Sequence, residues 1–419
     1  MEKSTFTNLF DSFDRAAGAT MYQPLRQSAR ERFRLLPLPS PRMEDWRFTS
    51  VEPIGQTPFE LPTTAVSFDA KSLPPLPTPD TLRLVFLNGQ FAPSLSALDT
   101  VPAGVQVGSL ADGSAETMRA SLAQIAGYQD HVFTALNTSF LSDGAYVLVP
   151  HGNVVKQPIE IIHLSQPGRH PIATFPRTWL VFGTHTQATV VERYLGNGAY
   201  FTNAVTEIVL AEHAVVDHVK LQEESPQAFH IANTQIVQAG HCSFTTHALS
   251  FGASIARNEV RVRFDGEHAE ATVNGLYVAA GTQHCDNFTV IDHAKPNCVS
   301  HEMYKGILGD QSHGVFNGKI FVRKDAQKTD AKQSNKVLLL SDGATINTKP
   351  QLEIFADDVK CTHGATIGQL DATQMFYLQS RGIPLDAARR LLTFAFANDV
   401  VGRLKIESLR EQLETRIVQ

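Results

Sequence analysis

A thiol and an imidazole stand two residues apart near the C-terminal end of the chain, at Cys361 and His363. In an extended strand, residues i and i+2 point to the same face, so these side chains and Val359 would lie side by side. Thiolate and imidazole both bind iron and zinc, although two ligands leave a tetrahedral ion half coordinated. The spacing alone favours a simpler interpretation, a buried thiol beside a hydrogen-bonded histidine. A metal site here would need further ligands from elsewhere.

The composition excludes several classes of function. The chain of 419 residues has a net charge of -6 and a pI near 6.2, without the basic excess or stripe typical of nucleic-acid binders. Neither a signal-like apolar segment in residues 1–13 nor a membrane-length apolar run is found, so we expect a cytoplasmic protein without membrane contact. The four cysteines are scattered and form no Cys-x-x-Cys pair, which argues against a disulfide framework and zinc-ribbon folds. No P-loop sequence occurs, so we expect no bound nucleotide.

The elements that would position the pair fall into three predicted domains. Residues 1–141 read as a helical region, with helices expected over 1–35 and 115–141, a proline-rich connector over 53–79, and a hairpin turning at Asn88-Gly89. Residues 142–370 contain short alternating β runs without a long helix between them. That length suits a solenoid better than a single sandwich, although no repeat of fixed length is present.

Residues 371–419 return to helical periodicity. Asp371 can cap a first helix, Gly382 can end it, and helices are expected over 385–401 and from about 406 onward. The middle helix has an apolar face formed by Ala388, Leu391, Leu392, Ala395 and Phe396. We expect most of this face to join the core, and any part left exposed would suit a docked partner.

An ordered series of short motifs in residues 286–400 is specific enough to indicate a family. The series contains His293, Pro296, Ser300, Tyr304-Lys305-Gly306-Ile307, Phe316-Asn317-Gly318-Lys319-Ile320, 325–331, 333–335, 338–342, 350–354, 357–361, His363 and 376–382. This pattern resembles the SufB/SufD family of iron-sulfur cluster assembly proteins. SufB chains typically carry glutamate after the histidine, whereas this chain has Gly364 and is shorter. The resemblance is therefore to the SufD branch.

The resemblance implies a right-handed parallel β-helix between helical regions, in a non-catalytic scaffold subunit. It implies a SufB partner joined through the β-helix cores, an ATPase partner, SufC, docked on the C-terminal helices, and a homodimer as an option when the chain is isolated. Iron or a transient iron-sulfur cluster would form at the SufB interface, with cysteine and glutamate from SufB and His363 from this chain. Cys361 and Val359 would lie beside His363 there. The expected SufC side comprises Phe376, Tyr377, Arg381, Phe394 and Phe396.

Two other functions remain compatible with the residues. A purely structural partner would hold the two other subunits in register without touching metal. A carbohydrate-active enzyme would also use a parallel β-helix, with a pair of carboxylates such as Asp265, Glu267 or Glu270 in a groove. The sequence does not give the separation between carboxylates that such an enzyme needs.

Overall fold

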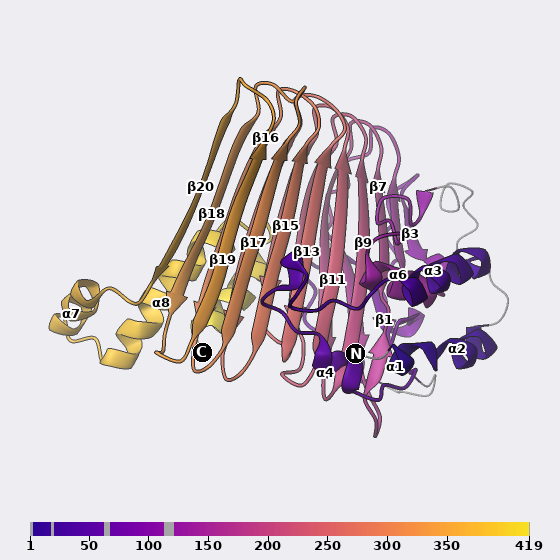
Figure 1. Ribbon diagram of the computed structural model, residues 1–419, viewed down its shortest axis with the longest axis horizontal. Coiled ribbons are helices and arrows are strands. Elements are labelled where there is room, and N and C mark those ends of the chain that lie inside the picture. Colours follow the sequence, from indigo (N-terminus) through magenta and orange to yellow (C-terminus); the bar gives the residue numbers. More distant parts are fainter. Residues whose placement is uncertain (1–2, 18–20, 63–67, 113–120, 419) are drawn as a thin grey trace.

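The computed structural model describes residues 3–17, 21–62, 68–112 and 121–418, and its body is a parallel β-solenoid built from two facing sheets (Figure 1). One sheet contains, in spatial order, β2 (Gln90–Phe91), β1 (Leu82–Leu87), β5 (Ile159–Ser165), β8 (Gln187–Gly196), β10 (Val215–Glu223), β12 (Ser243–Ser250), β14 (Glu270–Ala279), β16 (Val299–Leu308), β18 (Asp330–Leu339) and β20 (Lys360–Gly368). The other contains β19 (Thr345–Ile354), β17 (His313–Val322), β15 (His284–His293), β13 (Ile255–Phe264), β11 (Phe229–Gln238), β9 (Tyr200–Leu210), β7 (Arg177–Phe182), β4 (Ala145–Val149) and β3 (Gln106–Ser109), with β6 (Ile172–Thr174) beside β9. The predicted parallel β-helix is confirmed.

Consecutive strands from β8 onward alternate between the two sheets, so each strand hydrogen-bonds to the strand one coil before and one coil after it. One corner of every coil has a positive φ angle, at His185, His213, His241, His268, Asn297 and Lys328. The intervals between these positions are 28, 28, 27, 29 and 31 residues, so they are similar but not constant. Unequal coil lengths explain why the sequence carries no repeat of fixed period.

The solenoid interior is apolar for much of its length but also contains a buried polar network. His218 hydrogen-bonds to Glu192 at 2.8 Å, and Lys220 hydrogen-bonds to Asn258 at 2.7 Å and to His230 at 3.0 Å. Burial by itself would raise the pKa of Glu192, but the hydrogen bond and charge of His218 outweigh it and lower that pKa to about 2. Burial lowers the pKa of Lys220 to about 8. Paired partners thus make these polar groups tolerable inside the coil.

The N-terminal helices pack on the outer face of the sheet that contains β9, near the first coils (Figure 1). They are α1 (Ser4–Thr7), α2 (Phe10–Ala17), α3 (Gln23–Leu35), α4 (Glu52–Gln56) and α6 (Val132–Ser139). Phe6, Phe10 and Phe33 are buried in one aromatic cluster. The hairpin is confirmed too, because β1 and β2 are antiparallel and both Asn88 and Gly89 have positive φ.

The helix predicted over 115–141 is wrong between residues 122 and 131. Residues 113–120 lie outside the described residues, 121–131 are mostly turns, and only Val132–Ser139 forms a helix of any length. The reason is a buried carboxylate. Glu207 accepts hydrogen bonds from the backbone N–H groups of Ala123, Ile125 and Ala126 at 2.9 to 3.1 Å, which replaces the helical pattern there.

The C-terminal helices are α7 (Ala372–Ser380), α8 (Leu385–Val401) and α9 (Glu407–Val418), close to the predicted limits. Asp371 accepts a hydrogen bond from the Gln374 N–H at 2.8 Å, and Gly382 has φ +85°, so the predicted cap and stop are both confirmed. The C-terminal part of α8 packs on the solenoid, as does α9. Helix α7 projects beyond the solenoid, at the far left of Figure 1. The division at residues 141/142 and 370/371 stays a prediction.

Candidate functional site

The C-terminal end of the solenoid is open. Strand β19 pairs only with β17, and β20 pairs only with β18, so each is the last strand of its sheet. Both are long, and their residues are mostly half-buried in β19 and exposed in β20. Each strand therefore leaves a row of backbone N–H and C=O groups without a strand partner among the described residues.

Cys361 and His363 lie on this last rung, as predicted. In register, Cys361 stands beside Ala331 and His363 beside Gln333, and both neighbours are buried in the interior. The thiol packs partly against the main core cluster, as does Val359, whereas His363 is exposed. Burial raises the pKa of the Cys361 thiol above its usual range. The structure thus brings all three residues to one face at the open end, with the imidazole outermost.

Two buried residues beneath His363 were not identified from the sequence as part of a site. Glu302, Gln333 and His363 occupy neighbouring positions on β16, β18 and β20, and the Gln333 amide donates to the Glu302 carboxylate at 2.6 Å. Burial raises the pKa of Glu302 to about 7. A Cβ at Gly318 would lie 2.4 Å from the Gln333 amide nitrogen, so that glycine makes room for it. These two residues could have been identified only from the register between neighbouring strands, which depends on the length of each coil.

The side-chain amide oxygen of Gln333 (Oε1) is buried and has no hydrogen-bond partner among the described residues. A histidine that binds metal through one ring nitrogen commonly donates its other N–H to such an acceptor, which fixes the ring orientation. Gly364, next to His363, is also informative: a Cβ there would meet nothing within 4 Å. The lack of a carboxylate at this position is therefore not imposed by crowding within the chain.

Coordination by this chain alone would be incomplete in the described region. No group of three or more His, Cys, Asp or Glu side chains within the residues that the structure covers could hold a metal ion. All four cysteines are free thiols, in agreement with the prediction of no disulfide framework. The pair at the open end therefore provides at most two ligands, with unpaired strand edges next to them.

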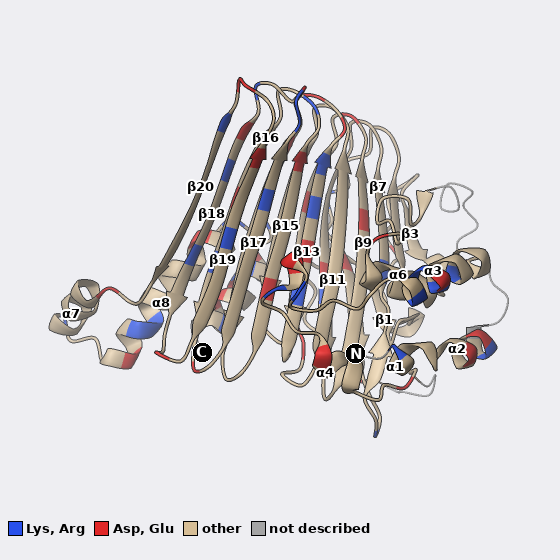
Figure 2. Cartoon of the chain, viewed as in Figure 1, with Lys and Arg blue, Asp and Glu red and all other residues tan. Residues whose placement is uncertain are grey.

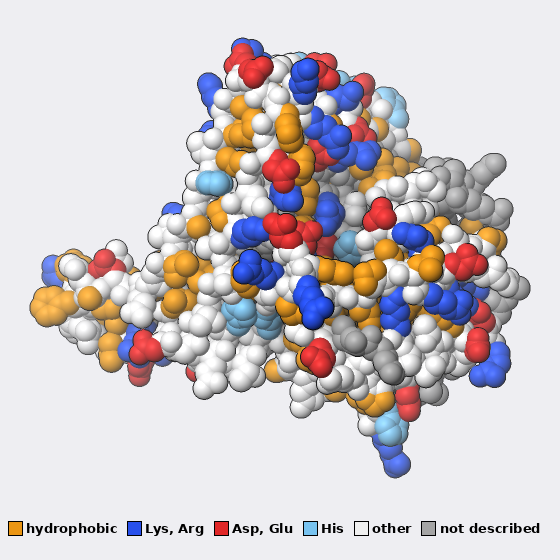
Figure 3. All heavy atoms as spheres, viewed as in Figure 1, with side chains coloured by type: hydrophobic (Ala, Val, Ile, Leu, Met, Phe, Trp, Pro, Cys, Tyr) orange, Lys and Arg blue, Asp and Glu red, His pale blue; other side chains and the backbone are white. Residues whose placement is uncertain are grey.

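A second candidate surface lies on α7 and the beginning of α8. Phe376 is 73% exposed, Tyr377 57% and Leu391 47%, and the view in Figure 3 shows hydrophobic side chains gathered at this projecting end. A shallow apolar groove is lined by Thr373, Gln374, Tyr377, Leu378, Leu391, Leu392 and Ala395. Of the predicted face, Ala388 is buried, Leu392 and Phe396 are half-buried, and Leu391 and Ala395 are exposed, so the expectation that the face joins the core fails at those last two residues. The short loop around Gly382 swings α7 away from the sheet and leaves that face uncovered.

The remaining residues predicted for this side lie differently. Arg381 is exposed at the end of α7, and its guanidinium lies 5.4 Å from the Tyr377 ring centre. Phe394 is half-buried. Phe396 packs against the solenoid cluster, where the Lys305 ammonium lies 4.2 Å from its ring centre and donates to its carbonyl at 2.8 Å. The structure thus separates Phe396 from Phe376 and Tyr377.

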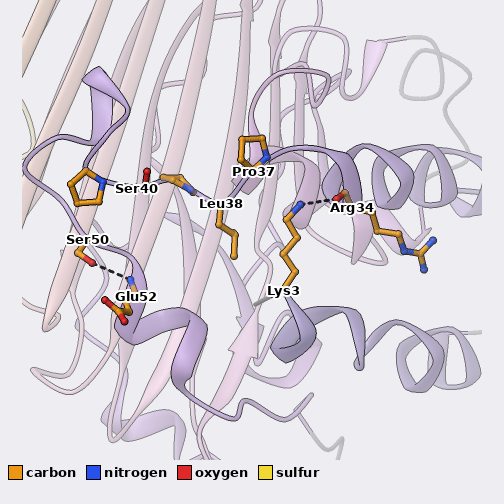
Figure 4. A pocket seen from close by; sticks show the side chains of 9 residues that line it. Lys3, Arg34, Pro37, Leu38, Ser40, Ser50 and Glu52 are labelled. Atoms are coloured by element: carbon orange, nitrogen blue, oxygen red, sulfur yellow. Dashed lines mark hydrogen bonds between the residues drawn. The ribbon is translucent and has the colours of Figure 1, made fainter. Parts of the chain in front are cut away.

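A further groove lies far from this end, against the N-terminal helices (Figure 4). Its cation is already engaged, since Lys3 donates to the carbonyl of Arg34 at 2.9 Å and to those of Phe33 and Leu36. Among the carboxylates considered for carbohydrate chemistry, Asp265 is bound by Arg263 at 2.6 and 2.7 Å on the exposed surface. Basic and acidic residues are interspersed over the strands visible in Figure 2.

A parallel β-solenoid with an open end bearing Cys and His, set between two helical regions, defines a class of scaffold that known families can be compared with. The chain matches the SUF system FeS cluster assembly SufBD core domain over residues 164–396 and the SufBD protein N-terminal region over residues 2–161. It is 35% identical to an iron-sulfur cluster assembly SufBD family protein of Synechocystis over 93% of this chain and 88% of that protein. It is 32% identical to the iron-sulfur cluster assembly protein SufD of Escherichia coli, over 96% and 94% of the two chains.

The chain therefore belongs to the SufB/SufD family of iron-sulfur cluster assembly proteins. SufD of Bacillus subtilis is a more distant relative, 30% identical over 68% of this chain and 65% of that one. No helix within the described residues is both long and apolar enough to span a membrane.

Proposed function

We propose that this chain is a SufD-type scaffold subunit that joins SufB through its open end and the ATPase SufC through α7 and α8, and that iron or a nascent iron-sulfur cluster is held at the SufB interface. The observation that carries this is the coincidence of two features on β20: its unpaired edge and its Cys361 and His363 side chains. A second β-helix that pairs with β19 and β20 would satisfy their backbone groups. It would also bring its own ligands to the last rung.

In this proposal His363 is the principal ligand from this chain, and Cys361 lies ready beside it. The exposed imidazole can reach a metal without movement of the core, whereas the thiol is partly covered and must lose a proton that burial helps it keep. An N–H donated from His363 to the side-chain amide oxygen of Gln333 would present the other ring nitrogen to the cluster.

The chain itself would be non-catalytic. It lacks a P-loop sequence, so the ATP-dependent work would be done by SufC. The exposed aromatic and aliphatic side chains of α7 and α8 are the kind of anchors that a stable interface buries.

The test is the substitution His363→Ala in the full SufB, SufC and SufD assembly, prepared without oxygen. We expect the complex to assemble with normal stoichiometry, because His363 is exposed, while the iron and acid-labile sulfide recovered with it fall at least tenfold. Thr362→Ala is the matched control, since Thr362 is exposed on the other face of the same strand. Cluster maturation at the natural level in the His363→Ala complex would contradict the assignment.

The purely structural alternative predicts a different result for the double variant. If Cys361→Ser/His363→Ala complexes carry the natural amount of iron and sulfide, then this chain only holds its partners in register. If the double variant loses cluster while His363→Ala alone keeps part of it, then Cys361 is also a ligand. Turnover of an anionic polysaccharide by the isolated chain would instead support the carbohydrate-active alternative.

A further inference from the structure

A column of histidines runs along one exposed corner of the solenoid, outside the open end. His185, His213, His241 and His268 stand at the same corner of successive coils, and all four are exposed. Their rings are stacked nearly parallel, with successive centroid distances of 4.6, 4.8 and 5.1 Å and interplanar angles of 5°, 11° and 12°. His151 adds a fifth ring, 5.9 Å from His185 and inclined at 75°. Five imidazoles thus form one continuous surface feature.

The backbone does not require histidine at these positions. Each of the four has a φ near +60°, a conformation that favours Asn, Asp, His or Gly. The next two coils, however, fill the same corner with Asn297 and Lys328, also at φ of 60° and 63°.

The backbone hydrogen bond at the corner is also the same, since His213, Asn297 and Lys328 each donate their N–H to a carbonyl one coil further on, at 3.1, 2.9 and 2.7 Å. The conformation of the turn therefore does not explain why four consecutive coils have histidine at this corner.

The spacing between neighbouring rings suits metal binding by pairs. Imidazole nitrogens bind Zn²⁺ at about 2.1 Å, so two of them on one tetrahedral ion lie roughly 3.4 Å apart. The rings are nearly parallel, with centres 4.6 to 5.1 Å apart, and nitrogen lone pairs in parallel planes do not meet at one ion. Binding by a pair therefore requires the two exposed side chains to rotate out of the stack. No group of three or more His, Cys, Asp or Glu side chains within the described residues could hold an ion, so the column offers two ligands to each ion.

We infer that this column is a surface site for divalent transition-metal ions of the class that imidazole prefers, Zn²⁺, Fe²⁺, Ni²⁺ or Cu²⁺. It holds two ions per chain. One is bound by His185 and His213, and the other by His241 and His268. The site is independent of Cys361 and His363, which lie on a different strand at the end of the solenoid.

The experiment compares two variants that each remove two histidines and differ only in which neighbours remain. His185→Asn/His241→Asn removes alternate rings, so that no adjacent pair survives in the column. His241→Asn/His268→Asn removes adjacent rings and leaves the pair His185 and His213. Asparagine tolerates the positive φ, as Asn297 shows in the same molecule, so both variants should keep the natural circular dichroism and melting temperature.

Zn²⁺ is titrated into the full-length chain by calorimetry. We expect two ions per natural chain and one ion in His241→Asn/His268→Asn. In His185→Asn/His241→Asn we expect no ion to bind, even at Zn²⁺ concentrations ten times the dissociation constant of the natural chain. The same titration in Cys361→Ser/His363→Ala separates these ions from any bound at the open end, because that variant keeps the column. Equal stoichiometry in the two histidine variants, or no Zn²⁺ bound to the natural column, would show that the rings only stack.

Discussion

The two ends of the solenoid are finished in opposite ways. At the first coils, the sheets begin with the two-residue strand β2 and the four-residue strand β3, each antiparallel to its neighbour, and helices pack alongside. At the last coil, the sheets end in the ten-residue β19 and the nine-residue β20, parallel to their neighbours and bare on the other side. Short or covered edge strands prevent unwanted pairing, so long bare ones indicate a surface meant to be paired.

The polar residues of the two ends differ in the same way. Near the closed end, Arg177 and Glu207 are fully buried and bonded to each other, and Glu207 also binds three backbone N–H groups. At the open end, His363 is exposed and the acceptor on Gln333 has no partner among the described residues. The polar groups near the closed end are thus bonded to other groups of the chain, whereas those at the open end can still bind a partner.

The largest expected effect comes from breaking the closed end with Glu207→Ala. This change leaves the Arg177 guanidinium buried without its carboxylate and releases three backbone N–H groups, and loss of one partner of a buried ion pair costs about 3 to 5 kcal/mol. Thermal or urea denaturation of the isolated chain should show this loss. Asp130→Ala is the control, because the Asp130 side chain is 97% exposed and its ion pair with Arg32 should contribute under about 1 kcal/mol. Equal stability of the two variants would refute the anchoring role of Glu207.

Acid should destabilise the chain through buried histidines. Burial lowers the pKa values of His163, His247, His284 and His293 to about 4. An unfolded histidine titrates near 6.5, so between pH 6.5 and 4 the unfolded chain binds more protons than the folded one. Stability is therefore fully present above pH 6.5 and is lost as the pH falls toward 4, by several kcal/mol in total.

The variant His163→Phe tests the acid prediction at one position. His163 lies between Phe86 and Tyr194, with ring centres 5.4 and 5.0 Å away, so a phenyl ring keeps the stack while removing the titrating group. We expect a shallower loss of melting temperature between pH 6.5 and 4 than in the natural chain. An identical pH profile would show that His163 does not contribute.

The open end is tested by Ile367→Lys, which places a charge on the apolar rim. Ile367 is 48% exposed beside Val337 on the last rung, so the isolated chain should lose less than about 0.5 kcal/mol. Association with SufB, measured by sedimentation, should weaken at least tenfold, because an unpaired ammonium would be buried there. Leu35→Lys is the control at the closed end, where Leu35 is 73% exposed. Equal loss of association in both variants would argue against the open end as the interface.

The sequence was sufficient for the elements that follow a local rule. The hairpin at Asn88-Gly89, the cap at Asp371 and the alternation that puts Cys361 and His363 on one face all depend on neighbouring residues. Resemblance to a family supplied the fold. Contacts between residues far apart in the chain were not predictable in this way, and Glu207 unwinding the segment around Ala123 is an example.

The register between neighbouring coils was the other feature that the sequence did not predict. Gln333 stands under His363 and above Glu302 only because the intervening coils have particular lengths, which no local pattern gives. The histidine column has the same origin. His185, His213, His241 and His268 are unremarkable one at a time, and they become a feature when unequal coils bring them to one corner.

The smallest effect on stability is expected at α7, which projects beyond the last coil of the solenoid. Phe376 is 73% exposed and α7 has no buried residue, so Phe376→Ser should change the free energy of unfolding by less than about 0.5 kcal/mol. If this helix is the docking site for SufC, an exposed aromatic anchor is where binding energy concentrates, and affinity for SufC should fall at least tenfold in calorimetry. Gln379→Ala, exposed on the same helix, should bind normally. Unchanged SufC affinity in Phe376→Ser would move the docking site off α7, toward the half-buried Phe394 or the rest of the groove on α8.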